Sequence, residues 1–384
     1  MADIRIAHID LTAFFVSVER LLHPEWVGKP IMVAGKADHR GVVTCASYEV
    51  RKFGVHAGMA TAIAERRCPI AIRVDSHRDA YEEYSRKVRT YLKKFSPEFE
   101  PASIDEFYID WTGCEKLFRS SIISFAEKLQ NNIMEQFGLP CAIGIASNKV
   151  TAKIACDQAK PYGIKEIEHG AEAAFLEPLD VKVLPGVGEV MLKQLHQFNI
   201  RTCGQLAKMT VEFVEENLGM WGLHIQEYAQ GKGSQKLSVM REQKQVSTEE
   251  TFAKDTRDKT FLHKTLHEMA LKLSEILRHS DIKTRCIHLK LRYSDWVDHT
   301  RQVSTQPTHD PAVIYKKSIQ LLEKADTRGL PIRLIGIGLS KFDEDETSLD
   351  LFDVDNSRRD RLLKAVDGIN SKFDKTVVQI GTAE

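Results

Sequence analysis

Residues 102–110, with the sequence ASIDEFYID, decide how the rest of the chain is interpreted. Their isoleucines and tyrosine favour a buried strand or a strand-turn-strand. The adjacent acids Asp105 and Glu106 stand where an ordinary sheet buries apolar side chains. Because neighbouring strand residues point to opposite faces, both carboxylates can meet one ion only if the backbone bends or one side chain reaches round an edge. Taken alone, such a pair is more often two solvated acids at the end of a strand.

The N-terminal stretch supplies a third carboxylate. Residues 4–11 (IRIAHIDL) are typical of a buried first strand with Asp10 near its end, and Thr12 can cap a helix over residues 13–20. Like charges raise one another's pKa and burial raises it further, so gathering three acids is costly unless a cation is present. Carboxylate-rich sites suit Mg²⁺, and two such ions about 3.5–4 Å apart activate a hydroxyl and stabilise a leaving phosphate. The sequence therefore predicts a magnesium site.

Length and composition indicate an ordinary soluble protein. The 384 residues, 42% hydrophobic and 28% charged, suffice for two to four domains. No apolar run approaches the roughly 18 residues of a membrane span, and no signal peptide precedes the first strand, so we expect a cytoplasmic protein. The seven cysteines are scattered, odd in number and never in C-x-x-C spacing, which predicts free thiols rather than disulfides or a zinc site.

Charge is unevenly distributed along the chain. The net charge is zero, but residues 232–342 carry 21 Lys and Arg against 13 Asp and Glu, whereas residues 343–384 carry 6 against 11. A basic region followed by an acidic tail is typical of a chain that binds a phosphate backbone with one part only. A solvated basic face explains such a surplus about as often.

A short polar helix lies among strands in the next region. Residues 30–34 and 41–45 are predicted strands, and residues 47–54 (SYEVRKFG) a short helix ended by glycine. Tyr48 and Arg51 are three apart and share one helix face. A hydroxyl and a guanidinium on that face would suit a triphosphate, since arginine binds phosphate bidentately. The alternative is a surface arginine stacked on a tyrosine.

Helices and strands alternate from residue 79 onward. We expect helices over residues 79–95 and 122–137, a strand over 141–146, and a helix over 149–155 that Asn148 caps and residues 159–163 end. This alternation, with acids at adjacent strand ends, predicts a ferredoxin-like sheet with helices on one face.

A helical region over residues 167–231 follows, and its signal is the turn VLPGVG at 183–188. Gly186 and Gly188 between helices let backbone N–H groups point at an anion. This is the helix-hairpin-helix pattern, which holds DNA phosphates without reading sequence. Residues 231–236 are a glycine- and lysine-rich linker.

The remaining region shows clean strand alternation. In residues 287–293 the apolar side chains share one face, and Lys290 and Arg292 lie on the other, which predicts a half-buried strand with a basic open face. Residues 333–340 alternate too, and their glycines would let another backbone approach the open face. Predicted helices over 260–279 and 311–325 would cover the buried face.

These motifs resemble those of the Y-family (translesion) DNA polymerases. The resemblance rests on D-x-x-x-F-F after the first strand, the SIDEFYID segment, YEVRKFGV, KPYG and the glycine turn, and it runs from about residue 1 to 342. It implies an α+β multidomain fold: a ferredoxin-like palm with small fingers, a helical helix-hairpin-helix thumb, and a separate α/β little finger domain. The implied boundaries are palm 1–19 and 77–165, fingers 20–76, thumb 166–232, linker 233–243, little finger 244–342 and acidic tail 343–384.

The resemblance also implies roles for individual residues. The catalytic acids, which hold two Mg²⁺ ions together with the carbonyl of Leu11, are Asp10, Asp105 and Glu106. Phe15 is the implied steric gate, which excludes a 2′-hydroxyl. The nucleotide-binding residues are Phe14, Phe15, Cys45, Tyr48, Arg51 and Lys160. The DNA-binding residues are Gly186, Gly188, Lys290, Arg292 and Arg333.

Three positions depart from the family pattern. Thr12 stands where many relatives carry a second acid, which is not expected to bind metal. Cys45 replaces a hydroxyl that usually meets the triphosphate; a thiol is a weaker donor, so lower nucleotide affinity is expected unless backbone amides suffice. Phe107 replaces an alanine, and we expect it to narrow the space behind the acids.

The tail contains SLDLF at residues 348–352, which resembles a bacterial sliding-clamp motif with serine in place of the usual glutamine. Leu349, Leu351 and Phe352 would be its anchors, and a tether to a clamp raises the effective concentration at the primer. The alternative is a strand or helix packed on the preceding domain.

The function implied is template-directed DNA synthesis, in which a primer 3′-hydroxyl attacks the α-phosphate of a dNTP. No segment resembles a proofreading exonuclease, so we expect low-fidelity, distributive translesion synthesis by a monomer that binds primer–template DNA, dNTP and a sliding clamp. One alternative is a non-catalytic scaffold of the same fold in a mutagenesis complex on the clamp. Another is a helix-hairpin-helix repair enzyme, which would need its own catalytic lysine or acid beside the hairpin.

Overall fold

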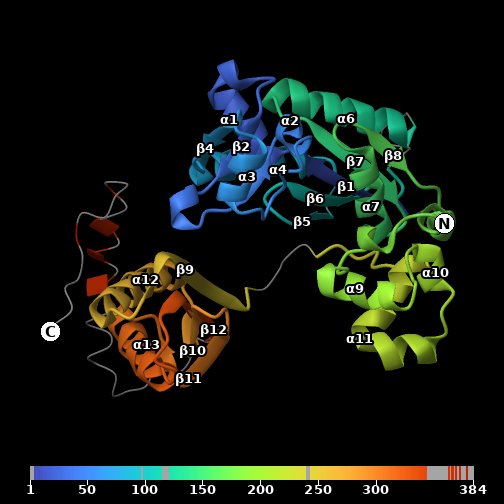
Figure 1. Cartoon of the computed structure of the whole chain (residues 1–384). Coiled ribbons are helices and arrows are strands. Elements are labelled where there is room, and N and C mark those ends of the chain that lie inside the picture. Colours follow the sequence, from blue (N-terminus) through green and yellow to red (C-terminus); the bar gives the residue numbers. More distant parts are fainter. Residues whose placement is uncertain are drawn as a thin grey trace. The chain divides into compact units, whose positions relative to one another are not determined.

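The computed structural model describes residues 4–96, 98–114, 121–238 and 243–343, and single positions between 362 and 378. The chain divides into two compact units, one of residues 1–37 and 41–241 and the other of residues 38–40 and 242–384 (Figure 1). Each unit mixes helices with at least one sheet, which confirms the predicted α+β multidomain fold. No helix in the described ranges is long and apolar enough to cross a membrane.

A five-stranded sheet is the centre of the first unit. Its strand order is β5-β6-β1-β7-β8, with β1 antiparallel to both β6 and β7, and β7 parallel to β8. All six residues of β1 are buried, as expected for the central strand. The strands are β1 (Ile6–Leu11), β5 (Phe99–Pro101), β6 (Glu106–Asp110), β7 (Cys141–Ala146) and β8 (Ile164–Glu166).

Helices cover both faces of this sheet, whereas the sequence predicted helices on one face. The odd-numbered residues of β1 pack in one core with α4 and α6. The even-numbered residues, which include His8 and Asp10, point to the opposite face, where α7 lies (Figure 1). The helices are α1 (Phe14–Leu22), α4 (Arg78–Leu92), α6 (Ile122–Phe137) and α7 (Lys149–Ala159).

A glycine in β7 allows α7 to pack directly on the sheet. A Cβ added at Gly144 would come within 2.1 Å of the Ala152 carbonyl oxygen and 2.2 Å of the Cys156 backbone nitrogen. Asn148 begins the helix as predicted, because its side chain accepts the Thr151 N–H at 2.9 Å. The close contact brings the polar side chains of α7 over the ends of β1 and β6.

Thr12 does not cap α1, so that prediction is wrong. The residue at the N-cap position is Ala13, which is in the left-handed region with φ 45° and offers no side-chain bond. The Thr12 hydroxyl instead donates to the Pro161 carbonyl, and the Ser17 hydroxyl donates to the Thr12 carbonyl at 2.8 Å. Thr12 therefore ties the end of β1 to the loop after α7.

A three-stranded sheet with its own small core follows α1 in sequence. Its order is β3-β2-β4, with β3 antiparallel and β4 parallel to β2. The predicted strands are present, and the predicted helix is shorter than expected, since it ends at Arg51 with Lys52 at its C-cap position. The elements are η1 (Pro24–Trp26), β2 (Ile31–Ala34), η2 (Ala37–His39), β3 (Val43–Ala46), α2 (Tyr48–Arg51), α3 (Thr61–Arg67) and β4 (Ile72–Val74).

The last part of the first unit is helical and surrounds an apolar core of its own. Gly186, with φ 91°, and Gly188 form the turn before α9, and Gly219, with φ 67°, interrupts α11. The elements are α8 (Glu172–Leu176), η3 (Val181–Val183), α9 (Glu189–Gln197), α10 (Cys203–Ala207) and α11 (Val211–Ala229).

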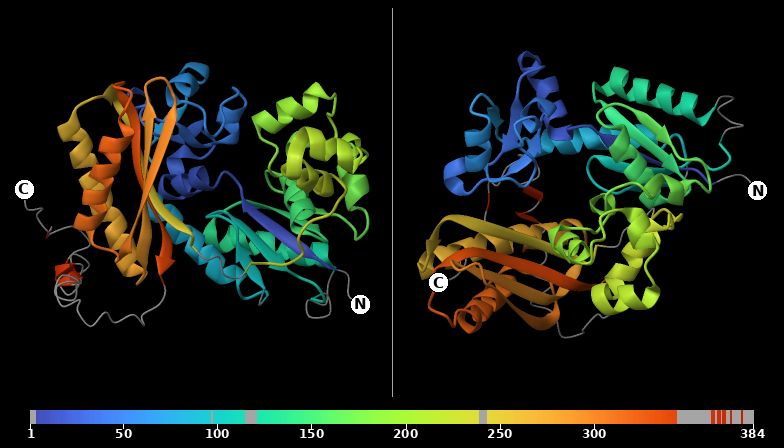
Figure 2. Two further views of the ribbon diagram at one scale, coloured as in Figure 1. Left: turned by 90° about the horizontal axis from the view of Figure 1, so that it is seen from below. Right: turned by 45° about the vertical axis from the view of Figure 1, so that its right-hand side comes forward.

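The second unit is a four-stranded antiparallel sheet of order β11-β10-β12-β9, with α12 and α13 packed side by side on one face (Figure 2). The predicted alternation of residues 287–293 is confirmed, because every second residue is fully buried. Strands β9 and β11 were not predicted from the sequence. The elements are β9 (Gln245–Thr256), α12 (Lys259–His279), β10 (Lys283–Tyr293), β11 (Asp298–Thr308), α13 (Pro311–Ala325) and β12 (Ile332–Asp343).

Candidate active site

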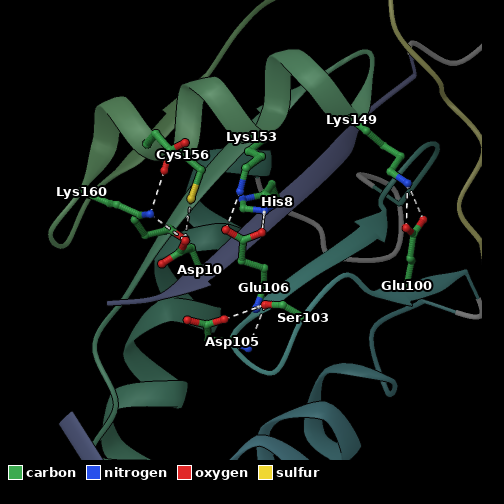
Figure 3. Close-up of polar contacts among 12 residues, drawn as sticks. His8, Asp10, Glu100, Ser103, Asp105, Glu106, Lys149, Lys153, Cys156 and Lys160 are labelled. Carbon is green, nitrogen blue, oxygen red and sulfur yellow. Dashed lines mark hydrogen bonds and ion pairs between the residues drawn. The ribbon is translucent and has the colours of Figure 1, made fainter. Parts of the chain in front are cut away.

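Strand pairing gathers the three predicted acids at one end of the central strands. In the register of β1 with β6, Asp10 lies directly opposite Glu106. The N–H of Leu11 donates to the carbonyl of Asp105 at 3.0 Å, which ties the end of β1 to the turn before β6. Figure 3 shows the three carboxylates in one region below α7. Adjacent acids thus reach one region because the backbone bends at Asp105.

Ser103 organises this bend. Its hydroxyl donates to Asp105 Oδ1 at 2.6 Å and accepts the backbone N–H groups of Asp105 and Glu106 at 3.2 and 3.0 Å. The Ser85 hydroxyl from α4 donates to the carbonyl of Ile104 and fixes the same turn from the other side. Serine is common in turns because its hydroxyl can bind nearby backbone N–H groups. Ser103, just before the two acids, was therefore the residue in the sequence that could have predicted this turn.

Two lysines, Lys153 of α7 and Lys160 directly after its last residue, form ion pairs with two of the acids (Figure 3). Lys160 Nζ lies 2.7 Å from Asp10 Oδ2 and 2.7 Å from Asp157 Oδ1. Lys153 Nζ donates to the Glu106 carboxylate. Lys160 was predicted to bind the triphosphate. Lys153 was not predicted, because nothing in the helical pattern distinguishes it from a surface lysine.

Burial dominates the electrostatics of Asp10. It raises the pKa of Asp10 from 3.8 to about 7; Lys160 opposes this shift, and Glu106 and Asp105 add to it. The pKa of Glu106 behaves differently: burial works to raise it, but the neighbouring His8 and the hydrogen bond and charge of Lys153 hold it below its ordinary value. The two facing carboxyls therefore differ widely in proton affinity.

His8 completes the polar cluster from β1. Its Nε2 lies 3.7 Å from Glu106 Oε2, beyond a normal hydrogen bond, and its ring centroid lies 4.6 Å from that of Tyr108. Burial lowers the pKa of His8. At neutral pH the histidine is therefore uncharged, and Lys153 is the cation beside Glu106.

The acids do not form a ready-made ion cage. Within the described ranges, no three His, Cys, Asp or Glu side chains are arranged so that they could hold a metal ion. Asp10 and Glu106 are directed at lysines, and Asp105 at Ser103. The donor set nevertheless fits a divalent cation, because the hard carboxylate oxygens of three residues lie at one strand end, where burial raises the pKa of Asp10 and Glu106 and Asp105 add to that shift.

Phe15, the predicted gate residue, stacks on an aromatic ring that the sequence analysis did not identify. Its ring lies 4.3 Å from Tyr81 of α4 at an interplanar angle of 12°. The Tyr81 hydroxyl donates to the fully buried carboxylate of Glu19, which His77 Nδ1 also contacts at 2.8 Å. Phe14 is a core residue. A rigid platform thus supports Phe15.

The other predicted nucleotide-binding residues occupy β3 and α2. The Arg51 guanidinium lies 4.6 Å from the Tyr48 ring centroid, and Arg51 Nε donates to the Ala46 carbonyl at 2.9 Å. This is the stacked arrangement that was the alternative interpretation of the motif. Cys45 is buried, and burial raises the pKa of its thiol. Phe107 stacks on Phe99 at 5.8 Å in the core, on the sheet face opposite Glu106.

The predicted DNA-binding residues fall in two separate places. A Cβ at Gly188 would meet nothing within 4 Å, while Trp221, which the sequence analysis missed, donates from Nε1 to the Gly186 carbonyl at 3.3 Å. In the second unit, the residues on the open sheet face are in ion pairs with carboxylates of their own unit; they are Lys290, Arg292 and Arg333. The clamp-binding residues Leu349, Leu351 and Phe352 lie outside the described residues.

Comparison with known proteins identifies one family throughout. The sequence matches the impB/mucB/samB family over residues 9–157, its C-terminal domain over residues 243–351, and the thumb domain of DNA polymerase-iota over residues 182–232. DNA polymerase IV of Dehalococcoides mccartyi is 39% identical over 98% of this chain and 97% of its own length. DNA polymerase IV of Clostridium kluyveri is 32% identical over 97% of this chain and 96% of its own.

Solved structures agree with these relatives. The Y-family DNA polymerase chimera Dbh-Dpo4(243-245)-Dbh superposes with a TM-score of 0.77 at 26% identity, over 88% of this chain and 98% of its own. DinB from Sulfolobus solfataricus gives a TM-score of 0.60 at 27% identity, over the same shares of the two chains.

The raised pKa of Asp10 predicts a pH-dependent stability. Since the folded state binds this proton more tightly than the unfolded state, Asp10 destabilises the fold progressively as pH rises from about 4 through 7. With the ions removed by a chelator, Asp10→Asn should therefore raise the unfolding free energy at pH 8 by about 2–3 kcal/mol more than it does at pH 5, and should raise the melting temperature correspondingly more at pH 8. Asp157→Asn, which removes the other partner of Lys160, is the control. A variant less stable than wild type at pH 8 would show that the Lys160 pair outweighs burial.

Proposed function

The chain belongs to the Y family of DNA polymerases and is a DNA-directed DNA polymerase, and from this premise we propose that it performs low-fidelity translesion synthesis with two Mg²⁺ ions and without proofreading. As a DNA polymerase it binds primer–template DNA and dNTP. The observation that carries the proposed mechanism is the pairing of Asp10 opposite Glu106, with Asp105 tied to the same strand end. Low fidelity and the lack of proofreading rest on family membership.

In the proposed mechanism the three acids and the Leu11 carbonyl hold the ions. When bound, the ions activate the primer 3′-hydroxyl and stabilise the leaving pyrophosphate. The protein's own contribution is positioning, since phosphoryl transfer needs little covalent chemistry from side chains. Lys160 sits at the end of α7 with its ammonium group already paired to carboxylates. That pairing supports its proposed second role, because the same ammonium can bind a triphosphate once Asp10 is otherwise neutralised.

Selection of the incoming nucleotide is proposed to depend on Phe15. Its support by the Tyr81 ring, itself anchored to Glu19, makes it a rigid wall rather than a mobile side chain. A side chain held in one position can exclude a 2′-hydroxyl, whereas a mobile side chain would move aside and admit a ribonucleotide. The remaining proposed nucleotide-binding residues are Phe14, Cys45, Tyr48 and Arg51.

The proposed DNA contacts are the amides of the Gly186–Gly188 turn and the open face of the β9–β12 sheet, which carries Lys290, Arg292 and Arg333. We also propose that Leu349, Leu351 and Phe352 bind a sliding clamp, which would compensate for weak hold on DNA. The enzyme is proposed to act as a monomer in the cytoplasm, where its seven free thiols would stay reduced.

Primer extension tests the proposed roles of the acids. Asp105→Asn combined with Glu106→Gln should slow extension of an undamaged primer–template with Mg²⁺ by about 10³-fold or more, because the donor set loses two charges. Binding of primer–template should be retained. The matched control is Glu100→Gln, which removes a nearby acid that also pairs with a lysine of α7, at 2.7 Å. Failure of the wild type itself to extend DNA that it binds would favour the scaffold alternative.

The same assay on damaged templates, with error frequencies measured on undamaged ones, tests translesion synthesis. Replicative-class accuracy without an added nuclease would contradict the low-fidelity proposal.

The gate proposal predicts a loss of sugar discrimination. Phe15→Val should lower the ratio of dNTP to rNTP incorporation efficiency by about 10²-fold, because the wall against the 2′-hydroxyl recedes. The measurement is single-nucleotide incorporation with each substrate. Phe125→Leu, which removes a core aromatic side chain of α6, should leave the ratio unchanged. Unchanged discrimination in Phe15→Val would exclude Phe15 as the gate.

A further inference from the structure

The open face of the β9–β12 sheet holds its cations in internal ion pairs. Lys290 Nζ lies 3.0 Å from Glu249 Oε2 and 3.9 Å from Asp298 Oδ2. Arg292 binds Asp298 through two bonds, from Nε to Oδ1 at 2.5 Å and from NH2 to Oδ2 at 2.9 Å. The face that the sequence predicted to be basic is thus largely neutralised by its own strands.

Glu249 reaches Lys290 across an intervening strand. Lys290 on β10 and Glu249 on β9 are both register partners of Gly336 on β12, which separates them. A Cβ at Gly336 would come within 2.6 Å of Glu249 Cγ, so the missing side chain leaves the path that Glu249 occupies. Gln245 occupies the space beside Gly338 in the same way, because a Cβ at Gly338 would lie 2.9 Å from Gln245 Nε2. These glycines therefore admit side chains of β9.

An internal carboxylate competes directly with a DNA phosphate for the same ammonium or guanidinium group. A lysine already neutralised within the protein gains little by binding a phosphate, since the internal pair must first break. The competition is intramolecular, so its effective concentration is high and constant. The bidentate geometry at Arg292 makes that pair the more persistent of the two.

We propose that Glu249 and Asp298 are built-in competitors of DNA phosphate, which occupy Lys290 and Arg292 in the free enzyme and thereby keep its affinity for primer–template low. The inference rests on the proposed DNA contact of this sheet face. It assigns Glu249 and Asp298 a role in setting how long the polymerase stays on DNA. The two acids lower the affinity for DNA by direct ion pairs rather than by long-range repulsion, because Glu249 contacts Lys290 and Asp298 contacts Arg292.

The test is a double-mutant cycle on the full chain, measured as the Kd for fluorescent primer–template at about 0.1 M salt without dNTP. Glu249→Gln should tighten binding about 5-fold, since it removes the nearer of the two carboxylates beside Lys290. Lys290→Met should weaken binding less than about 2-fold in the wild type but about 5-fold or more in the Glu249→Gln background. Asp298→Asn and Arg292→Met should form a second cycle of the same sign.

Glu268→Gln on α12 is the control for net charge, because Glu268 pairs with Lys264 of its own helix, at 3.9 Å, and not with Lys290 or Arg292. Weaker binding by Glu249→Gln, or a gain no larger than that of Glu268→Gln, would overturn the inference. So would equal losses from Lys290→Met in both backgrounds, although the sheet would then remain a DNA-binding face. If neither Lys290→Met nor Arg292→Met changes the Kd in any background, the proposed DNA contact itself fails and the inference fails with it. Unchanged melting temperatures would show that each variant is folded.

Discussion

The antiparallel pairing of β1 with β6 is the interaction on which the candidate site depends. It sets Asp10 opposite Glu106 and thereby creates a local excess of negative charge inside a buried sheet. That excess must be neutralised, and α7 supplies Lys153 and Lys160 for this purpose. The helix can deliver them only because Gly144 lets it pack against the sheet backbone. The packing of the first unit thus places a lysine beside each of these two acids, whose burial as unpaired charges would be costly.

The second unit uses the same physical device with the charges reversed. In the first unit, lysines stand in for the cations that the acids are proposed to bind; on the open sheet face of the second, carboxylates stand in for the phosphates that the basic residues are proposed to bind. Both places also depend on a glycine: Gly144 makes room for the backbone of α7, and Gly336 makes room for the side chain of Glu249. In a free enzyme built in this way, a ligand binds by displacing an internal partner of the charged group.

Sequence patterns predicted those features that local chemistry determines. The helix over residues 122–137, the strand over 141–146 and the Asn148 cap all follow from periodicity and capping, and each is confirmed. The Thr12 cap was wrong because a tertiary partner, the Pro161 carbonyl, takes its hydroxyl. The prediction that helices cover only one face of the sheet was also wrong, because α7 packs on the face opposite α4 and α6. The alternation of apolar residues in a strand does not determine on which face a later helix packs.

Within the site, the acids and Lys160 were identified from the sequence, but their partners were not. Lys153 has the same helical spacing as any exposed lysine, and Tyr81 lies in a polar helix with no sign of its contacts to Phe15 and Glu19. β9 and β11 were missed because their long polar side chains, such as Glu249, cover an open sheet face and break the apolar alternation. Contacts between residues far apart in the sequence, such as Lys290 and Glu249, depend on the register of the strands and cannot be predicted from a local pattern.

The most direct test of the account is a crystal structure of the enzyme with primer–template, a non-hydrolysable dNTP and Mn²⁺, in which anomalous scattering locates the ions. The account predicts two anomalous peaks bounded by Asp10, Asp105 and Glu106, with the Lys160 ammonium moved from Asp10 to the triphosphate. Peaks elsewhere, or none, with the pairs of Lys160 to Asp10 and of Lys153 to Glu106 intact, would contradict it.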